Sequence, residues 1–577
     1  MASLTGRPKA YPLAPLGVFN GSAFHGGCKL NEVMRYGLII LILQAAPALA
    51  QRDPCADSGS LRLVNGRIHT IDQRNSVVAE VTIQHGRFAY LGPARNARLD
   101  PCTKVIDLGG RTAVPGLVDN HNHIVLLGLR PGYDTRLETA ASIADVQAMI
   151  RTRAKGVPPG QFITAMGGWN PAQFAEKRLP TLAELDTAAP DHPVIVYQAF
   201  TGPAAVNSRA RAYFSAKGIA VSDAGLIAAN APSVAALDAL RAAQTFEDQK
   251  RGTLDAMMYA ASVGVTTSVD MGAFVIPGLP DIQDSFTFDT LASADPFHMY
   301  DAFTALHRAG RMSMRLRIFF LSMDTQTDVP MLADRLRNTF LDFGDDMLRL
   351  SGIGEFATNW PLFGQATPPP NYTAALELIA QKGWPFQQHS LSPAEDQLAV
   401  GTFEKINAVT PIANLHWSIA HAPRIDQATI DRLKATGAGI AVHPFAYLNA
   451  QGGGPPLRMI LGSGIHVGAG SDSAQISTLD PWLMIYYMVT GKNAAGVLVN
   501  AGQLITRAEA IRLYTANNGW FFREEDQLGS IESGKLGDVV VLNNDFFDPK
   551  KVADPDIPHL KSVLTVVGGK VVYNDMH

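Results

Sequence analysis

The middle of the chain alternates between short apolar segments and longer helical stretches, and each apolar segment ends on a polar residue. Such alternation is typical of a parallel β-sheet wrapped by helices. Eight apolar segments end in this way, at His121/His123, Asp270, Ser322, Glu355, His389, His421, His443 and Asp472. Because eight strands close a (β/α)8 TIM barrel, the pattern predicts that α/β fold, with catalytic residues at these strand ends.

The two ends of the chain have a different pattern, in which short apolar runs are separated by turn residues. The N-terminal runs cover residues 61–64, 81–83, 88–91 and 105–108, and the C-terminal runs cover 538–542 and 563–573. Runs of this kind are typical of short antiparallel strands. We therefore expect residues 51–115 and 526–577 to join into one small β-sandwich, which flanks a barrel formed by residues 116–525.

The connection between the first two barrel strands is far longer than a single helix. It covers about residues 129–250 and contains an apolar run of its own, from Pro193 to Phe200. This length predicts an inserted subdomain, or lid, after the first strand of the barrel.

Residues 34–50 have the pattern of a secretory signal peptide: a short positive start, the apolar run Leu38–Leu43 and small residues up to Ala50. The apolar run is too short to span a bilayer, although a membrane anchor is the alternative interpretation. Residues 1–33 precede a candidate initiator, Met34, and are expected to be an over-extended gene start or a tail outside the fold. The mature protein is expected to be periplasmic or secreted, without a stable membrane anchor.

Two cysteines, Cys55 and Cys102, follow the signal segment. In an oxidising compartment, two cysteines make one disulfide a natural hypothesis. The chain contains no C-x-x-C spacing, so a metal site would have to be built from histidines and carboxylates.

Composition narrows the range of partners. The 577 residues carry a net charge of −4, and only 17% of them are charged. This balance provides no basic stripe for nucleic acid, and it favours a large buried interior with a site for a small-molecule substrate.

His121-Asn122-His123 is the strongest chemical signal in the sequence. Alternate residues of a strand point the same way, so both imidazoles face one point at the strand's end. Imidazole is the commonest neutral ligand for zinc and similar ions. His389 and His421 end two other strands, and Asp472 ends the eighth strand, which a closed barrel places beside the first. These residues together predict a metal site in which Asp472 both ligates the metal and accepts a proton from its water.

Further motifs give the chain a family resemblance. They are Gly168-Trp169-Asn170, residues 179–186, Val206-Asn207-Ser208, residues 264–267 and residues 529–538. With the histidines, they make the chain resemble the amidohydrolase superfamily, specifically the amidohydrolase family 3 group of deacylases and deformylases. The resemblance implies metal-dependent hydrolysis, usually of an amide, with zinc as the ion.

The chain departs from its relatives at the end of the fourth strand. Most relatives carry a lysine there, in a K-x-x-x-D pattern, whose carbamylated amine bridges two metals. Here Glu355 stands in place of the lysine and Asn359 in place of the aspartate. Since a glutamate presents two oxygens, we expect a binuclear site bridged by Glu355. The alternative is a single metal, with Glu355 only hydrogen-bonding.

A second departure concerns the substrate. Relatives usually place a histidine shortly before the Asn-Ser pair, where this chain has Pro203, whose side chain neither donates nor accepts. A substrate different from that of the relatives is therefore expected. Aromatic residues near strand ends or in the lid favour an apolar or aromatic ligand, although each is equally consistent with an ordinary core residue. The candidate substrate-binding residues are Trp169, Trp360, His443 and Tyr447.

In the mechanism that these residues suggest, Asp472 takes a proton from the attacking water and delivers it to the leaving group. Two alternatives remain open at this point: non-hydrolytic chemistry, such as decarboxylation, on the same metal site, and a metal-retaining binding protein without catalysis.

Overall fold

The computed structural model describes Cys55 and residues 60–576, except 96–99, 274–290, 292–293, 295–297, 362–365, 444, 449–452 and 474–476. The expected signal peptide, residues 34–50, and residues 1–33 lie outside the described residues. No described helix has both the length and the apolar character needed to cross a membrane.

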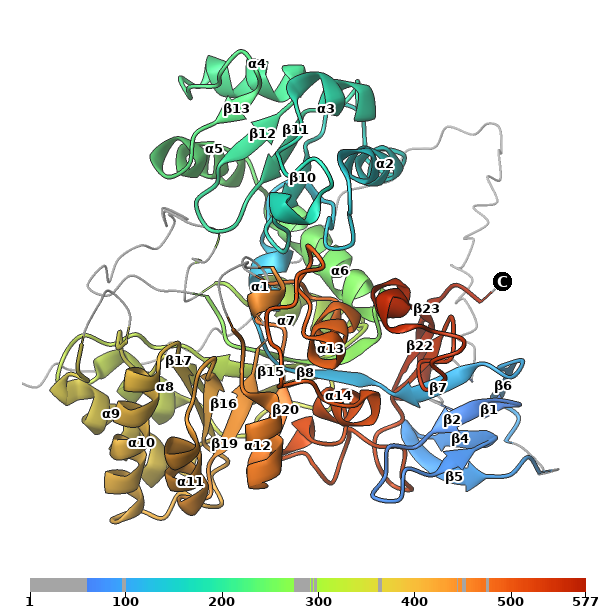
Figure 1. Cartoon of the computed structure of the whole chain (residues 1–577), viewed down its shortest axis with the longest axis vertical. Helices are drawn as coiled ribbons and strands as arrows, with labels where there is room; N and C mark the ends of the chain where they lie inside the picture. The colour runs from blue at the N-terminus through green and yellow to red at the C-terminus, as the bar shows by residue number, and fades with distance from the viewer. Residues whose placement is uncertain are drawn as a thin grey trace, which may run out of the picture. The chain divides into compact units, whose positions relative to one another are not determined.

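Eight parallel strands form the central sheet, in the order β20-β19-β18-β17-β16-β15-β14-β8. Their bounds are β8 (Leu117–Asn122), β14 (Val265–Asp270), β15 (Arg315–Phe320), β16 (Leu348–Glu355), β17 (Phe386–Ser390), β18 (Ser418–His421), β19 (Gly439–Val442) and β20 (His466–Ala469). The predicted barrel is thus confirmed, and each expected end residue lies at its strand's end or one to three residues beyond it (Figure 1).

A side-chain amide fills the seam between the last strand, β20, and the first, β8. Asn518, in the 3-10 helix η4 (Asn518–Phe522), donates through Nδ2 to the carbonyl oxygens of Val118 and Ala469. Its Oδ1 accepts from the backbone N–H of Ala469 at 3.1 Å. Gly468 makes room for this amide, because a Cβ at that position would lie 2.0 Å from Asn518 Oδ1. The C-terminal part of the chain therefore closes the barrel.

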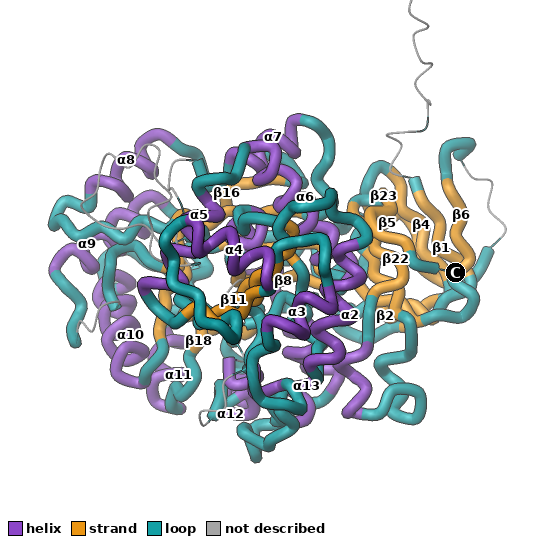
Figure 2. Tube along the Cα trace, turned by 90° about the horizontal axis from the view of Figure 1, so that it is seen from above, coloured by secondary structure: helices purple, strands orange, loops and turns teal. Residues whose placement is uncertain are grey.

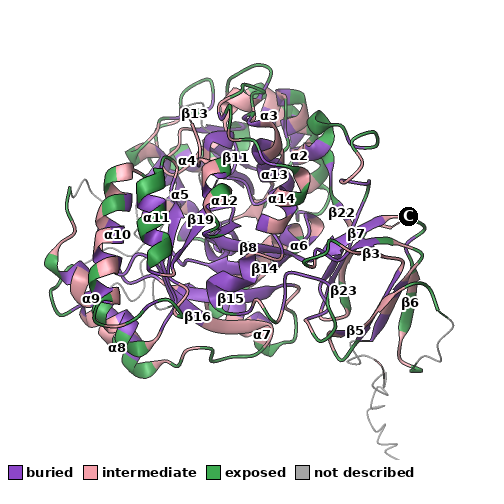
Figure 3. Cartoon of the chain, turned by 60° about the horizontal axis from the view of Figure 1, so that its bottom comes forward, coloured by how far each residue is buried: buried purple, intermediate pink, exposed green. Residues whose placement is uncertain are grey.

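Helices cover the outside of the barrel strands, and most of them, such as α10 and α11, turn an apolar face inward and an exposed face outward (Figure 3), whereas α1 is buried and α13 has no exposed residue. They are α1 (Ile124–Gly128), α6 (Phe246–Ser262), α7 (Asp301–Arg308), α8 (Pro330–Asn338), α9 (Pro370–Lys382), α10 (Pro393–Asn407), α11 (Gln427–Ala435), α12 (Leu457–Ser463), α13 (Pro481–Thr490) and α14 (Arg507–Leu513). The largest hydrophobic cluster joins strands β16 to β20 to the helices that follow them.

The apolar run Thr112–Val118 forms two strands rather than one. It breaks at Gly116 into β7 (Thr112–Pro115) and β8, which belong to different sheets. Gly116 donates its backbone N–H to Asp538 at 2.9 Å, and a Cβ there would lie 2.1 Å from Thr266 Oγ1. The run looks continuous because both halves are buried.

Strands from both chain ends pair in one six-stranded sheet, in the order β23-β22-β21-β7-β2-β3 (Figure 2). A second sheet has the order β5-β4-β1-β6, and residues of both sheets share one hydrophobic cluster. The expectation of antiparallel strands is only partly right, because β1 pairs with β6, and β2 with β7, in parallel. The strands are β1 (Leu61–Val64), β2 (Arg67–His69), β3 (Val77–Val78), β4 (Glu80–Gln84), β5 (Arg87–Gly92), β6 (Lys104–Asp107), β21 (Val539–Leu542), β22 (Ser562–Val567) and β23 (Lys570–Asn574).

A disulfide joins Cys55 to Cys102. It ties the start of the described chain to the segment just before β6, 47 residues later. The disulfide hypothesis from the sequence is confirmed.

Between β8 and β14 the chain builds a separate five-stranded sheet, in the order β13-β12-β11-β10-β9, flanked by its own helices (Figure 1). Two hydrophobic clusters fill it. Its elements are β9 (Tyr133–Asp134), α2 (Ile143–Ala154), β10 (Ile163–Met166), α3 (Leu182–Ala188), β11 (Val194–Tyr197), β12 (Ala204–Val206), α4 (Ser208–Ala216), β13 (Leu226–Ile227) and α5 (Ala231–Arg241).

Candidate metal centre

His121, His123 and Asp472 form one potential metal-binding group, and their ligand atoms lie within 4.8 Å of one another. His123 Nε2 lies 3.1 Å from Asp472 Oδ1, and His121 Nε2 lies 3.6 Å from the same oxygen. The backbone N–H of Asp472 donates to the His121 carbonyl at 2.8 Å. The first and last barrel strands therefore present these side chains to one point, as the barrel prediction requires.

The Nδ1 atoms of both histidines are fixed by hydrogen-bond acceptors. His123 Nδ1 lies 2.7 Å from the Gly272 carbonyl oxygen, and His121 Nδ1 bonds to Gln387 Oε1. A carbonyl oxygen only accepts, so Nδ1 carries a proton, and Nε2 is the atom that faces the centre and would ligate a metal.

Glu355, His389 and His421 form a second group of potential ligands. Glu355 Oε2 lies 2.6 Å from His389 Nδ1 and 3.0 Å from His421 Nε2. His421 has a left-handed backbone, with φ 71°, and so does Asp472, with φ 47°. Non-glycine residues adopt this conformation at a cost, and such residues cluster at functional sites.

The Glu355 carboxylate lies between the two groups. Its Oε1 is 3.4 Å from His123 Nε2, whereas its Oε2 faces His389 and His421. Oε2 also lies 3.7 Å from His121 Nε2, so the carboxylate stands between the two groups, where a bridging ligand would lie.

The donor set fits divalent metal ions. Among the described residues, only imidazoles lie within ion-pair distance of the buried Glu355 and Asp472 carboxylates. Two buried carboxylates without lysine or arginine partners require another source of positive charge. His121 Nε2, moreover, is buried without a hydrogen-bond partner. Imidazole and carboxylate ligands suit zinc and related ions.

Burial and neighbouring groups shift the pKa values here in opposite directions. Burial raises the pKa of the Glu355 carboxyl, but His389, His123 and His421 outweigh it and hold the pKa well below its usual range. For Asp472, burial is likewise outweighed by His121 and His123, so its pKa is lowered. Burial and the neighbouring His389 lower the pKa of His421 to about 4. Both carboxylates are therefore ionised, and His421 is neutral at pH 7, which is the state of a metal ligand.

His443 supports His421. Its Nδ1 accepts the backbone N–H of His421 at 3.1 Å and lies 2.7 Å from His421 Nδ1. His421 thus donates through Nδ1 and keeps Nε2 as a lone pair. The proton of His443 must lie on Nε2, which is buried without a partner.

Asp270 ends the second barrel strand, as predicted, and it orders the loop beside His123. Its Oδ1 accepts from the N–H of Gly272 at 2.8 Å and from the Tyr300 hydroxyl at 2.7 Å. Together these bonds hold the carbonyl that orients His123. The supporting roles of Gln387 and Gly272 escaped the sequence analysis, because neither residue has ionisable chemistry: Gln387 lies inside β17, and Gly272 follows the end of β14 by two residues.

The aromatic candidates lie in packed surroundings. Trp169 stacks on Phe174 with ring centroids 5.8 Å apart, and Trp360 packs against Tyr372 at 4.7 Å. Tyr447 is buried in the 3-10 helix η3 (Phe445–Tyr447). These ring contacts are the ordinary core packing that the sequence left as the alternative.

Two phenylalanines outside the four candidate substrate-binding residues pack against rings of the metal centre. Phe356 stacks against the His389 ring at 4.7 Å, and Phe445 lies 4.9 Å from the His421 ring. Phe356 follows Glu355 directly, so adjacency to a ligand was a usable signal.

The model of the amidohydrolase family matches residues 104–573, which cover the barrel, the inserted sheet and strands β6, β7, β21, β22 and nearly all of β23 in the two flanking sheets. The chain belongs to the amidohydrolase family. It is accordingly a metal-dependent hydrolase of carbon–nitrogen bonds, and the resemblance found in the sequence is confirmed.

Individual proteins agree with this assignment. The N-substituted formamide deformylase of Arthrobacter pascens is 24% identical over 89% of this chain and 98% of its own length. An uncharacterised metal-dependent hydrolase from Pyrococcus horikoshii has a TM-score of 0.55 at 18% identity, covering 84% of this chain and 98% of that one. The zinc complex of atrazine chlorohydrolase TrzN from Arthrobacter aurescens has a TM-score of 0.50 at 16% identity, over 89% and 95% of the two chains. These two structures share the fold.

Proposed function

We propose that the protein is an exported, binuclear zinc amidohydrolase that cleaves the amide bond of a small apolar or aromatic substrate. The observation that carries the proposal is the placement of Glu355, whose carboxylate stands between two groups of imidazoles. His121, His123 and Asp472 would hold one cation, and His389 and His421 the other. Cations held there supply Lewis acidity, which polarises a carbonyl and makes water acidic.

Asp472 performs the proton transfers in this proposal. Its pKa is held low by His121 and His123 against the effect of burial, so it is ionised and can accept a proton from the attacking water. It then passes that proton to the departing nitrogen. His443, with its proton on Nε2, is a donor for the substrate's carbonyl oxygen or for its leaving group.

The expected substrate class follows from the neighbours of the ligands. Phe356 and Phe445 pack against the rings of His389 and His421, so they provide apolar surface beside the metal centre. The match to a formamide deformylase over nearly its whole length makes N-substituted formamides the first compounds to assay, whereas Pro203, in place of the relatives' histidine, favours another acylated amine as the preferred substrate. The other aromatic candidates are buried and would support this apolar surface by packing rather than by contact with the substrate; they are Trp169, Trp360 and Tyr447.

Export is supported by the disulfide between Cys55 and Cys102, because such bonds persist in oxidising compartments. The signal-peptide pattern of residues 34–50 points the same way. Expression with and without residues 1–50, followed by fractionation, tests the compartment.

The decisive experiment combines a metal count with product analysis. Purified enzyme reconstituted with zinc is assayed on aromatic N-substituted formamides in ¹⁸O-labelled water. We expect full activity at two zinc equivalents and ¹⁸O in the released acid. Full activity at one equivalent would overturn the bridge. Turnover without ¹⁸O would indicate lyase chemistry, and metal retention without turnover across acylated amines, lactams and aryl esters would indicate a binding protein.

A further inference from the structure

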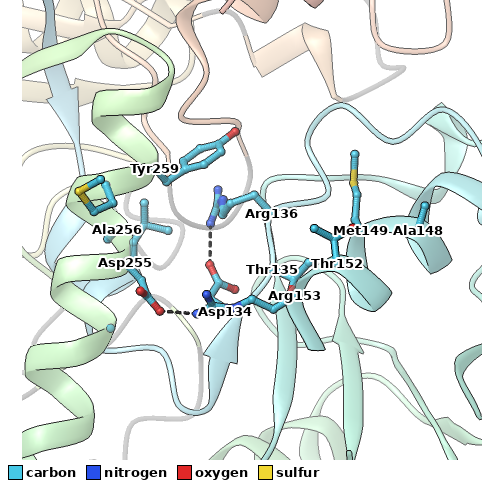
Figure 4. A pocket seen from close by; sticks show the side chains of 13 residues that line it. Asp134, Thr135, Arg136, Ala148, Met149, Thr152, Arg153, Asp255, Ala256 and Tyr259 are labelled. Carbon is cyan, nitrogen blue, oxygen red and sulfur yellow. Dashed lines mark hydrogen bonds and ion pairs between the residues drawn. The ribbon is translucent and has the colours of Figure 1, made fainter. Parts of the chain in front are cut away.

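A cavity of about 530 Å³ lies apart from the metal centre, between helices α2 and α6 and the segment that follows β9 (Figure 4). This volume is within the range of sites that hold small organic molecules, about 300–1,000 Å³. Its lining includes none of the six candidate metal ligands. One wall comes from α2 of the inserted sheet and the other from α6 of the barrel.

The walls of the cavity are largely apolar. Polar side chains lie where β9 and the two residues after it line the cavity. Leu127, Ala148, Met149, Ala256 and Met258 provide the apolar surface. Asp134, Thr135 and Arg136, from β9 and the two residues after it, provide polar groups together with Tyr259. Such a lining suits an apolar body with a single polar group.

The charged side chains of the cavity already neutralise one another. Arg136 Nη1 pairs with Asp134 Oδ2 at 3.3 Å, and Arg153 pairs with Asp255 (Figure 4). A fully charged ligand would therefore bring an uncompensated charge into a partly buried site, which costs free energy. This pairing favours a neutral occupant.

Four buried polar atoms of the lining residues have no hydrogen-bond partner. Thr135 Oγ1 and the Nε atoms of Arg136 and Arg153 can donate, and Asp134 Oδ1 can accept. Leaving buried polar groups without partners costs free energy, which a bound ligand that pairs with them recovers. A carboxamide satisfies both kinds, because its carbonyl oxygen accepts while its N–H donates.

The polar part of the cavity is connected to the loop that follows Asp472. Arg136 and Tyr259 both bond to the buried Glu138, the tyrosine at 2.7 Å. The Glu138 carboxylate also accepts the backbone N–H groups of Leu479 and Asp480, each at 3.1 Å. Two cavity residues thus share one carboxylate with the loop after β20.

We propose that this cavity binds a small neutral amide with an apolar body, and that its occupancy strengthens the order of residues 477–480. The site is separate from the metal centre and does not depend on the proposed substrate. An amide bound there would hold Arg136 and, through Glu138, the backbone of Leu479 and Asp480.

The test is a titration of the full, zinc-loaded chain with 4-fluorobenzamide, followed by ¹⁹F NMR. Ala148 and Ala144 are both exposed on α2, one turn apart, but only Ala148 lines the cavity. We expect Ala148→Phe to weaken binding at least tenfold and Ala144→Phe to leave it unchanged. Thr152→Phe, on the same wall, is a second blocking variant. Unchanged binding in both blocking variants, or no binding to the wild type at millimolar probe, overturns the proposal.

Two further measurements test the chemistry and the connection. 4-Fluorobenzoate and 4-fluorobenzylamine are expected to bind at least fivefold more weakly than the amide, and equal binding of either ion overturns the neutral assignment. Hydrogen exchange of a peptide covering residues 477–485 is expected to slow on saturation with the amide. Unchanged exchange in the bound state overturns the effect on the loop.

Discussion

The backbone N–H of Asp472 donates to the carbonyl oxygen of His121 at 2.8 Å, so the proposed proton carrier and a metal ligand are joined through their main chains. The bond spans the first and last strands of the barrel. Because this bond involves only main-chain atoms, it keeps Asp472 beside His121 and His123 even when the side chain is changed.

Asp472→Asn is therefore expected to fold normally but to turn over at least about 100-fold more slowly. The main-chain bond to His121 does not involve the side chain, whereas an amide cannot accept a proton as a carboxylate does. Turnover on the formamide substrate and the zinc content of the variant are the measurements. Turnover within a few-fold of the wild type would disprove the assignment of Asp472.

Glu355→Gln is expected to reduce bound zinc from two equivalents to one or fewer. The variant removes the negative charge between the two imidazole groups but retains the size of the side chain. Metal analysis after dialysis gives the count, and circular dichroism checks the fold. Retention of two equivalents would contradict the bridging role of this carboxylate.

Asp396→Asn should change how stability depends on pH. Burial raises the pKa of the Asp396 carboxyl to about 7, even though Ser390 Oγ donates to it at 2.6 Å. Between about pH 4 and pH 7 the folded chain retains a proton that the unfolded chain releases, so this group lowers stability as pH rises. Asparagine carries no ionisable proton, so the variant does not lose free energy of unfolding in this way as pH rises. We expect it to be about 2–4 kcal/mol more stable than the wild type at pH 8, with little difference at pH 4.

Urea unfolding at pH 4, 6 and 8 measures this effect. Asp431→Asn, on the exposed face of α11, is the control for loss of a carboxylate. An Asp396→Asn curve parallel to the wild-type curve at all three pH values would show that the carboxyl does not titrate in this range.

Asn518→Ala tests how the barrel is closed. The variant loses the bonds to Val118 and Ala469 and leaves buried backbone groups unsatisfied, for an expected cost of about 3–5 kcal/mol. The neighbouring Asn517 makes one side-chain bond, to the Val467 carbonyl at 2.9 Å, so Asn517→Ala should cost about 1 kcal/mol. Equal losses in the free energy of unfolding of the two variants, measured by urea unfolding, would show that Asn518 does not close the barrel.

The sequence predicted the barrel because each buried strand ends where a polar side chain must reach the mouth, as at Glu355 and Asp472. It predicted the convergence of His121 with Asp472 for the same reason, since strand order in a closed barrel is fixed. The apolar pattern itself does not mark the break at Gly116, because the strands on both sides of it are buried.

Contacts between distant segments were equally out of reach. Gln387 orients His121 across 266 positions, and an uncharged glutamine inside a strand has no distinguishing pattern. Aromatic residues such as Trp360 were candidates for the substrate pocket because they follow strand ends. The direction in which a loop side chain points is set by tertiary packing, however, and Trp360 packs against Tyr372.

The seam at Asn518 also bears on the order of events during synthesis. Strand β8, which carries His121, cannot be locked to β20 until residue 518 has left the ribosome, roughly 400 residues later. The nascent chain therefore holds an incomplete barrel for most of its translation. If residues 34–50 direct export, the catalytic centre would be assembled only after translocation, where zinc could be loaded as the final step of maturation.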